Sequence, residues 1–288
     1  MKLKAVRDFL QSQISHEMVT HFGCTDRRLL EEITDNWFND QNNYDGRWRT
    51  ISERVPQPGR VLDMAAGCGT FVLYGLRNGY DVWGVEPEAW KLEYFRRKIG
   101  ASGYASEFCQ RIIPATGEKL PFADDSFDLV TSYQTLEHVQ NVKECLGEML
   151  RVVKPGGILY LRAPDYNSFF EPHYRLPFLP CMNRKIASFY LRSLGRPESG
   201  LHHLNWTTER SVVRTLRECG YEIEVARTSH YDLESLRECA RKKAPFLSGN
   251  RFLVDLLVAG HLLKYRVAKL TKVGREERVI DLWVGKVS

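Results

Sequence analysis

The sequence predicts an α/β fold built on a doubly wound sheet, and two observations support this class. Between Arg60 and Leu161, short apolar runs alternate with segments of helical periodicity. Each of the runs that we expect to form parallel strands is bounded by Gly, Pro or Asp. The alternation of strand and helix is typical of a doubly wound sheet. With 288 residues, 43% of them hydrophobic, the chain is long enough to bury one large core.

The strands and helices of this region follow from the sequence in order. The expected strands are RVLDM, DVWGVE, CQRIIPA, FDLVTSY and GILYLRAP, and the expected helices are FVLYGLRN, EAWKLEYFRRKI and VKECLGEMLRVV. Right-handed crossovers place the carboxyl ends of such strands at one edge of the sheet. Ligands of open α/β sheets bind at that edge.

The flanking segments complete a single predicted domain. Thr208 is the expected N-cap of a helix that ends at Gly220, before the strand YEIEVA. The last strand is RVIDLWVGKV. The predicted parts are an N-terminal helical cap (1–55), a cofactor-binding core (56–164), a lid without a regular pattern (165–205), further core (206–229), a basic helical insertion between the last two strands (230–276) and the last strand (277–288).

Composition excludes several classes of protein. The seven cysteines stand singly, with no CxxC and no His pair at ligand spacing, so we expect reduced thiols, no structural zinc and no metal site. The opening MKLKAVRDFLQSQ lacks the apolar core of a signal peptide, and no run is long enough to span a membrane. We therefore expect a cytoplasmic protein. A net charge of +5 is too small to indicate nucleic acid as a partner.

A glycine-containing loop after the first strand indicates a cofactor site. Gly67 and Gly69 lie in this loop, but Val72 replaces the third glycine of the dinucleotide fingerprint. Asp63, which precedes the loop, would repel a pyrophosphate, so a nicotinamide oxidoreductase is disfavoured. A carboxylate here suits a cationic cofactor, such as the amino group and sulfonium of S-adenosylmethionine.

At this loop the sequence resembles the class I S-adenosylmethionine-dependent methyltransferases, whose first motif is D/E-x-G-x-G-x-G. Asp63, Ala65, Gly67 and Gly69 occupy the motif positions, with Ala65 in place of the first glycine. GVEPE places Glu86 at the end of the second strand, 23 residues after Asp63, where the family's acid bonds the ribose hydroxyls. A carboxylate accepts both hydroxyl hydrogens at once.

The resemblance continues through ATGEKLPFADDSFDLVTSYQTLEHV, LRVVKPGGILYLRAPD and HLNWTTERSVVRTLRECGYEI. Thr116 stands where many members have an Asp for the adenine amino group, so that contact falls to the backbone. The resemblance implies a seven-stranded Rossmann-like sheet and S-adenosyl-L-methionine as cofactor. The residues it implies in cofactor binding are Asp63, Ala65, Gly67, Gly69, Glu86, Thr116, Gly117 and Tyr133. The alternative is that the glycines only form turns and that Asp63 only caps a helix.

The candidate catalytic residues are histidines. Methyl transfer is an in-line displacement, and a hydroxyl acceptor benefits from a general base near neutral pH. His138 follows the fourth strand, at the expected cofactor edge, whereas His173 and His203 lie in the lid. The alternative for each is a structural or packed histidine. Tyr174, Arg175 and His202 are the candidate substrate-binding residues.

The predicted function is therefore O-methylation of a small-molecule or glycan-type hydroxyl. Two acceptor classes compete: an anionic or lipid-linked saccharide, and an aromatic or quinone-type phenol. The basic residues of the lid favour the saccharide unless they form only a solvated face; they are Arg175, Arg184, Lys185 and Arg192. A catalytically inactive cofactor-binding partner protein is a more remote alternative, because Asp63 and Glu86 are intact.

The insertion at 230–276 joins basic residues to an apolar stretch, Phe252 to Leu263, that is too short to cross a bilayer. One interpretation is a helix packed on the core or on a homodimer face. The other is a helix on an anionic membrane surface, which makes the contact with the membrane peripheral.

Overall fold

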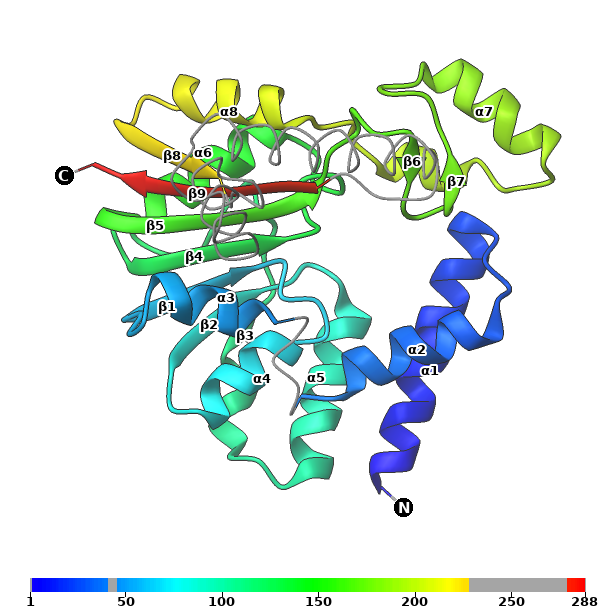
Figure 1. The fold of residues 1–288 in the computed structure, drawn as a ribbon. Coiled ribbons are helices and arrows are strands. Elements are labelled where there is room, and N and C mark those ends of the chain that lie inside the picture. The colour runs from blue at the N-terminus through cyan, green and yellow to red at the C-terminus, as the bar shows by residue number, and fades with distance from the viewer. Residues whose placement is uncertain (1, 41–45, 228–278, 288) are drawn as a thin grey trace, which may run out of the picture.

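The computed structural model describes residues 2–40, 46–227 and 279–287, and within them a seven-stranded sheet runs through the molecule (Figure 1). The strand order is β3-β2-β1-β4-β5-β9-β8. The strands are β1 (Arg60–Met64), β2 (Asp81–Val85), β3 (Ile112–Ile113), β4 (Phe127–Tyr133), β5 (Val153–Pro164), β8 (Ile223–Arg227) and β9 (Val279–Lys286). Strand β9 runs antiparallel to both β5 and β8, and β1 to β5 pair in parallel. The predicted α/β fold class is confirmed.

Helices cover both faces of the sheet (Figure 1). One layer contains α3 (Arg47–Arg54), α4 (Thr70–Arg77) and α5 (Ala89–Ser102), and the other contains α6 (Val142–Val152) and α8 (Glu209–Glu218). The predicted cap of α8 is present, because the Thr208 hydroxyl accepts a hydrogen bond from the Ser211 backbone N–H at 3.1 Å.

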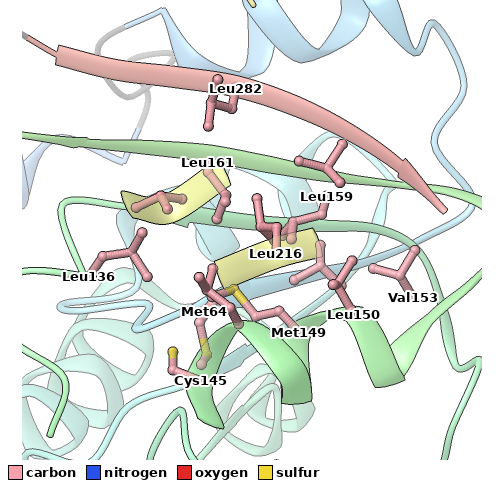
Figure 2. Packing of buried hydrophobic residues seen from close by; sticks show 14 of the residues in the cluster. Met64, Leu136, Cys145, Met149, Leu150, Val153, Leu159, Leu161, Leu216 and Leu282 are labelled. Carbon is pink, nitrogen blue, oxygen red and sulfur yellow. The ribbon is translucent and has the colours of Figure 1, made fainter. Parts of the chain in front are cut away.

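The two faces have different cores. Aliphatic and sulfur-containing side chains fill the space between the sheet and α6 and α8, among them Met64, Met149, Leu159, Leu216 and Leu282 (Figure 2). Aromatic stacking dominates the other face, where Trp48 of α3 stacks on Phe71 with ring centroids 4.3 Å apart. The burial of Trp48 fixes α3 against the start of α4, beside the glycine loop.

The N-terminal helices pack beside the sheet. Helix α1 (Lys2–Phe22) contacts α5, and α2 (Arg27–Phe38) begins at the N-cap Asp26, whose side chain accepts from the Arg28 N–H at 3.0 Å. The end of α1 reaches the lid, where the rings of Phe22 and Tyr174 meet edge to face at 5.2 Å. A single helix thus connects the cofactor side of the sheet with the lid.

The lid, residues 165–205, is more regular than its sequence predicts. It contains the hairpin strands β6 (Phe170–Glu171) and β7 (Leu176–Pro177), α7 (Arg184–Ser193) and a 3-10 helix, η2 (Ser199–His203); another, η1 (Ser106–Gln110), precedes β3. Asn183 caps α7 by accepting from the Lys185 N–H at 2.9 Å. Helix α7 buries only Ala187 and Leu191, so its apolar stripe is too narrow to stand out in the sequence.

Two predictions about the flanking parts are not settled by this fold. The insertion at 230–276 falls in the part of the chain that lies outside the described residues, and the division into parts within one domain stays a prediction. Within residues 2–40, 46–227 and 279–287, no helix has the length and apolar character needed to cross a bilayer.

Candidate active site

The glycine loop lies at the carboxyl ends of β1 and β2. The Ala66 N–H donates to the Val85 carbonyl at 2.8 Å, and the Gly69 N–H donates to the Ala66 carbonyl at 2.9 Å. Ala65, at the position of the family's first glycine, has a φ of 55° in the left-handed region. The backbone therefore has the conformation that a glycine would allow, and Ala65 tolerates it at a cost.

The two glycines that follow have different roles. A Cβ on Gly69 would lie 2.3 Å from Cδ2 of Phe95, so this glycine permits α5 to pack against the loop. A Cβ on Gly67 would meet no protein atom within 4 Å. Gly67 has a φ of 56°, and its N–H donates to Oε2 of Glu86 at 2.8 Å. The open space lies over Gly67, beside a carboxylate that is already oriented.

Glu86 is the acid at the end of β2. Its side chain is buried and accepts a second hydrogen bond from the Glu88 N–H at 3.0 Å. Burial raises the pKa of Glu86 above the usual 4.5, although Lys91 and the two backbone donors oppose the change. A carboxylate oxygen accepts more than one hydrogen bond, so Glu86 retains capacity for a pair of ligand hydroxyls.

Asp63 has a protein partner that sequence analysis missed. The guanidinium of Arg47 forms an ion pair with the Asp63 carboxylate, and the two side chains are only 3% and 2% exposed. Nη2 of Arg47 also donates to the Thr131 hydroxyl at 2.9 Å. Burial raises the pKa of Asp63, and Arg47 opposes this rise. A direct contact of Asp63 with the cofactor stays a prediction, and no feature of the residues around Arg47 indicated this pairing.

The segment after β3 has a structural role that can be described directly. Gly117 lies against Met64 and Cys145: a Cβ there would be 2.5 Å from Cε of Met64 and 2.7 Å from Sγ of Cys145. Glu118 accepts from the N–H groups of Gln140 at 2.7 Å and Asn141 at 3.1 Å. Partial burial tends to raise the pKa of Glu118, but these backbone donors lower it overall.

The remaining predicted cofactor residues lie near the same edge. The backbone carbonyl of Thr116 accepts from the Lys119 N–H at 3.4 Å. The ring of Tyr133, at the end of β4, lies near the guanidinium groups of Arg47 and Arg162, which are 5.0 and 4.9 Å from its centroid. Contacts of Thr116, Gly117 and Tyr133 with a cofactor stay predictions.

The structure brings the three candidate catalytic histidines together. His138 lies in the loop after β4, and the Thr135 hydroxyl holds this loop against the end of β1 by donating to the Met64 carbonyl at 3.4 Å. Nε2 of His138 is 3.2 Å from Nε2 of His173, and Nδ1 of His138 is 3.3 Å from the carbonyl oxygen of His203. His203 therefore contacts His138 through its backbone, while its own ring meets His21.

The surroundings of His138 favour the neutral imidazole. Desolvation by the protein, and next the charge of His173, lower its pKa to about 3. The side chain of His138 is nevertheless 42% exposed, so a ligand can reach the ring. A neutral ring at physiological pH is able to accept a proton or to bind a cation.

The candidate substrate-binding residues do not converge. Tyr174 is buried in the apolar cluster of the lid, with Phe178 and Leu191, whereas Arg175 and His202 are exposed. Arg184 donates to the backbone carbonyls of Leu201 and Leu204, so its guanidinium is hydrogen-bonded within the lid. The substrate roles of Tyr174, Arg175 and His202 stay predictions.

The sheet order, the glycine loop and the buried acid after β2 together define a nucleotide-type cofactor fold with the site at the strand ends. Comparison with known proteins identifies the class. Residues 62–161 match the methyltransferase domain family. The chain is 36% identical over 185 residues to a demethylmenaquinone methyltransferase of Clavibacter sepedonicus, across 62% of this chain and 72% of that protein. The chain belongs to the class I S-adenosylmethionine-dependent methyltransferase family.

Other relatives match a smaller part. An uncharacterized methyltransferase of Mycobacterium sp. (strain KMS) is 35% identical over 126 residues, which cover 44% of this chain and 47% of that protein. The chain thus spans about half the length of this relative. An S-adenosylmethionine-dependent methyltransferase structure from Mesorhizobium loti shares the fold, with 17% identity, a TM-score of 0.50, and coverage of 84% of this chain and 98% of that one.

S-adenosyl-L-methionine is the cofactor of this family, and the residues present fit it. The open space over Gly67 gives a ligand close access to the backbone, and the carboxylate of Glu86 suits a diol.

Proposed function

We propose that the protein transfers the methyl group of S-adenosylmethionine to a hydroxyl of a quinone-type or phenolic acceptor. The observation that carries this proposal is the position of His138, in the loop that Thr135 ties to the end of β1 and facing a second histidine of the lid. The bound cofactor supplies an electrophilic methyl group. The protein must then hold the acceptor oxygen in line with it and remove the hydroxyl proton.

The residues of the chain support three parts of this task. Glu86, held by two backbone donors, orients the cofactor. The histidine pair assists removal of the hydroxyl proton, and desolvation together with the charge of His173 favours the neutral form of His138. The lid excludes water through its apolar cluster, which packs on the end of α1 at Phe22.

The choice of an aromatic acceptor over an anionic saccharide rests on two observations. Arg184 is engaged by backbone carbonyls of the lid, and Arg192 lies 3.9 Å from Glu198, so both cations have partners within the protein. An aromatic ring lies beside the histidine pair: His173 stacks on Phe22 with centroids 5.3 Å apart and planes at 27°. The name of the Clavibacter sepedonicus relative also favours a quinone-type acceptor.

The test uses the full chain with methyl-labelled cofactor and three acceptors: a reduced naphthoquinone, a simple catechol and an anionic saccharide. Mass spectrometry and fragmentation locate the label. We expect a methyl ether on one of the aromatic acceptors and no product from the saccharide. A label on ring carbon contradicts methylation of a hydroxyl. A label on the saccharide alone contradicts an aromatic acceptor.

A further inference from the structure

Two imidazole rings face one another between the loop after β4 and the lid. The rings of His138 and His173 meet edge to face, with planes at 86° and centroids 5.0 Å apart, and their Nε2 atoms are separated by 3.2 Å. The two histidines are 35 positions apart in the sequence, so the fold alone creates this contact.

The other nitrogen of each ring has an oxygen acceptor. Nδ1 of His173 is 2.8 Å from Oε1 of Glu171, and Nδ1 of His138 is 3.3 Å from the carbonyl oxygen of His203. A carbonyl or carboxylate oxygen only accepts hydrogen bonds, so each Nδ1 carries the hydrogen. In the neutral rings both Nε2 atoms then present lone pairs, and the two atoms are 3.2 Å apart.

Two nitrogen lone pairs this close repel each other unless both nitrogens bind one cation. Either one ring carries an additional proton or both nitrogens bind one metal ion. In a tetrahedral site with bonds of about 2.0–2.1 Å, two nitrogen ligands are about 3.3 Å apart. The observed separation of 3.2 Å matches that expected for two ligands of one ion.

A carboxylate lies beside the pair. Glu137 is fully buried, and its Oε1 is 4.0 Å from Nε2 of His138. The three ligand atoms of Glu137, His138 and His173 all lie within 4.8 Å of one another. These distances are longer than those between ligands of one bound ion, so the carboxylate moves toward the two nitrogens to complete a two-histidine, one-carboxylate site.

We propose that Glu137, His138 and His173 bind one divalent first-row transition-metal ion, for which Zn²⁺ is the probe. The hydrogen bonds made by the Nδ1 atoms of the two histidines are of the kind found around metal-binding histidines. Ligating histidines donate their other N–H to a carboxylate or a backbone carbonyl, which fixes the tautomer and the direction of the ring. Glu171 and the carbonyl of His203 fill these two positions, and Oε2 of Glu171 is itself held by the Tyr174 N–H at 2.6 Å.

Three protein ligands leave at least one coordination position for another group, as in catalytic metal sites. The role of that position rests on the proposed function: the oxygen of the acceptor hydroxyl occupies it, and the positive charge lowers the pKa of that hydroxyl. The O–H proton passes to solvent, the new bond joins oxygen to the methyl carbon, and the carbon–sulfur bond of the cofactor breaks. The ion takes no part in redox chemistry.

The experiment measures Zn²⁺ binding by equilibrium dialysis of the metal-stripped full chain against a competing chelator, without acceptor. The proteins are wild type, His173→Ala, His138→Asn, Glu137→Gln and, as a control, His16→Ala, an exposed histidine of α1. We expect wild type and His16→Ala to bind one more ion per chain than the two histidine variants, and Glu137→Gln to weaken binding at least tenfold.

Titration with S-adenosylhomocysteine in each protein separates folding and cofactor binding from ion binding. If His173→Ala or His138→Asn retains cofactor affinity and binds as many ions as wild type, with equal affinity, the metal site is overturned and the histidines share a proton. If wild type binds zinc at these residues but no S-adenosylhomocysteine, the proposed function fails and the metal site stands.

Discussion

The Arg47 guanidinium forms an ion pair with the Asp63 carboxylate beneath the glycine loop, and neither side chain is more than 3% exposed. Arg47 opens α3, whereas Asp63 belongs to the central strand β1. The ion pair therefore joins the N-terminal helical segment to the strand that leads into the cofactor site. The same carboxylate that the family motif identifies is also a structural link in this chain.

Replacing Asp63 is expected to destabilise the protein as well as to affect its ligand. Asp63→Ala leaves a buried, unpaired guanidinium, which typically costs about 3–5 kcal/mol. The free energy of unfolding, measured by urea denaturation, should fall by that amount. The double variant Arg47→Met with Asp63→Leu should recover most of the loss, because no charge is then buried. Equal stability of Asp63→Ala and wild type would show that the pair is solvated.

Ala65→Gly is expected to stabilise the apo protein. Ala65 has a φ of 55°, where a Cβ costs roughly 1–2 kcal/mol. Glycine regains part of this energy but loses more entropy on folding, so the net gain is about 0.5–1 kcal/mol. Thermal denaturation should show a higher midpoint. A lower midpoint would mean that the methyl group of Ala65 packs better than its backbone suggests.

Cofactor affinity is expected to fall at acid pH because of Glu86. Burial raises its pKa above 4.5, and only the carboxylate accepts hydrogen bonds from two hydroxyls. As the pH falls through this raised pKa, the affinity for S-adenosylhomocysteine should decline, beginning at a higher pH than for an ordinary glutamate. Calorimetric titrations across the acid range measure this. Glu86→Gln should bind weakly with no such pH dependence; a parallel decline in that variant would assign the effect to another group.

His138→Ala is expected to lower turnover by about a hundredfold to ten-thousandfold while cofactor affinity stays near that of wild type. The reason is its position at the β4 edge, facing His173 rather than the glycine loop. His203→Ala should have a much smaller effect, because only the backbone carbonyl of His203 contacts His138. Initial rates with saturating cofactor measure both. If His203→Ala lowers turnover more than His138→Ala does, the base is His203 and not His138.

The sequence predicted those parts of the site that lie within one continuous motif. Strand periodicity places the glycine loop after β1 and Glu86 at the end of β2, the resemblance to the family implies their role, and the structure joins them through the Gly67 N–H. The sequence also identified His138, His173 and His203 as candidates, but it could not show that they meet. Contacts over long sequence separations depend on how the lid packs, which local patterns do not encode.

Arg47 and the lid show the same limit. A buried arginine is indistinguishable from an exposed one in a short polar helix, and its partners, Asp63 and Thr131, come from two different strands. In the lid, α7 buries only two residues, so its helical period is weak in the sequence. Tyr174, a candidate for substrate binding, is a core residue because Phe22 of the distant α1 covers it.

The central claim is that the open space over Gly67 and the carboxylate of Glu86 bind S-adenosylmethionine. Isothermal titration with S-adenosylhomocysteine tests it most directly, in wild type, Glu86→Ala and the control Glu93→Ala. Glu93 is a partly exposed acid on α5 that pairs with Arg97. Lost charge-assisted hydrogen bonds cost about 1.5–3 kcal/mol, so Glu86→Ala should bind about 10- to 150-fold more weakly than wild type, and Glu93→Ala should match wild type. Equal affinity of Glu86→Ala and wild type, with both proteins folded, would contradict the account.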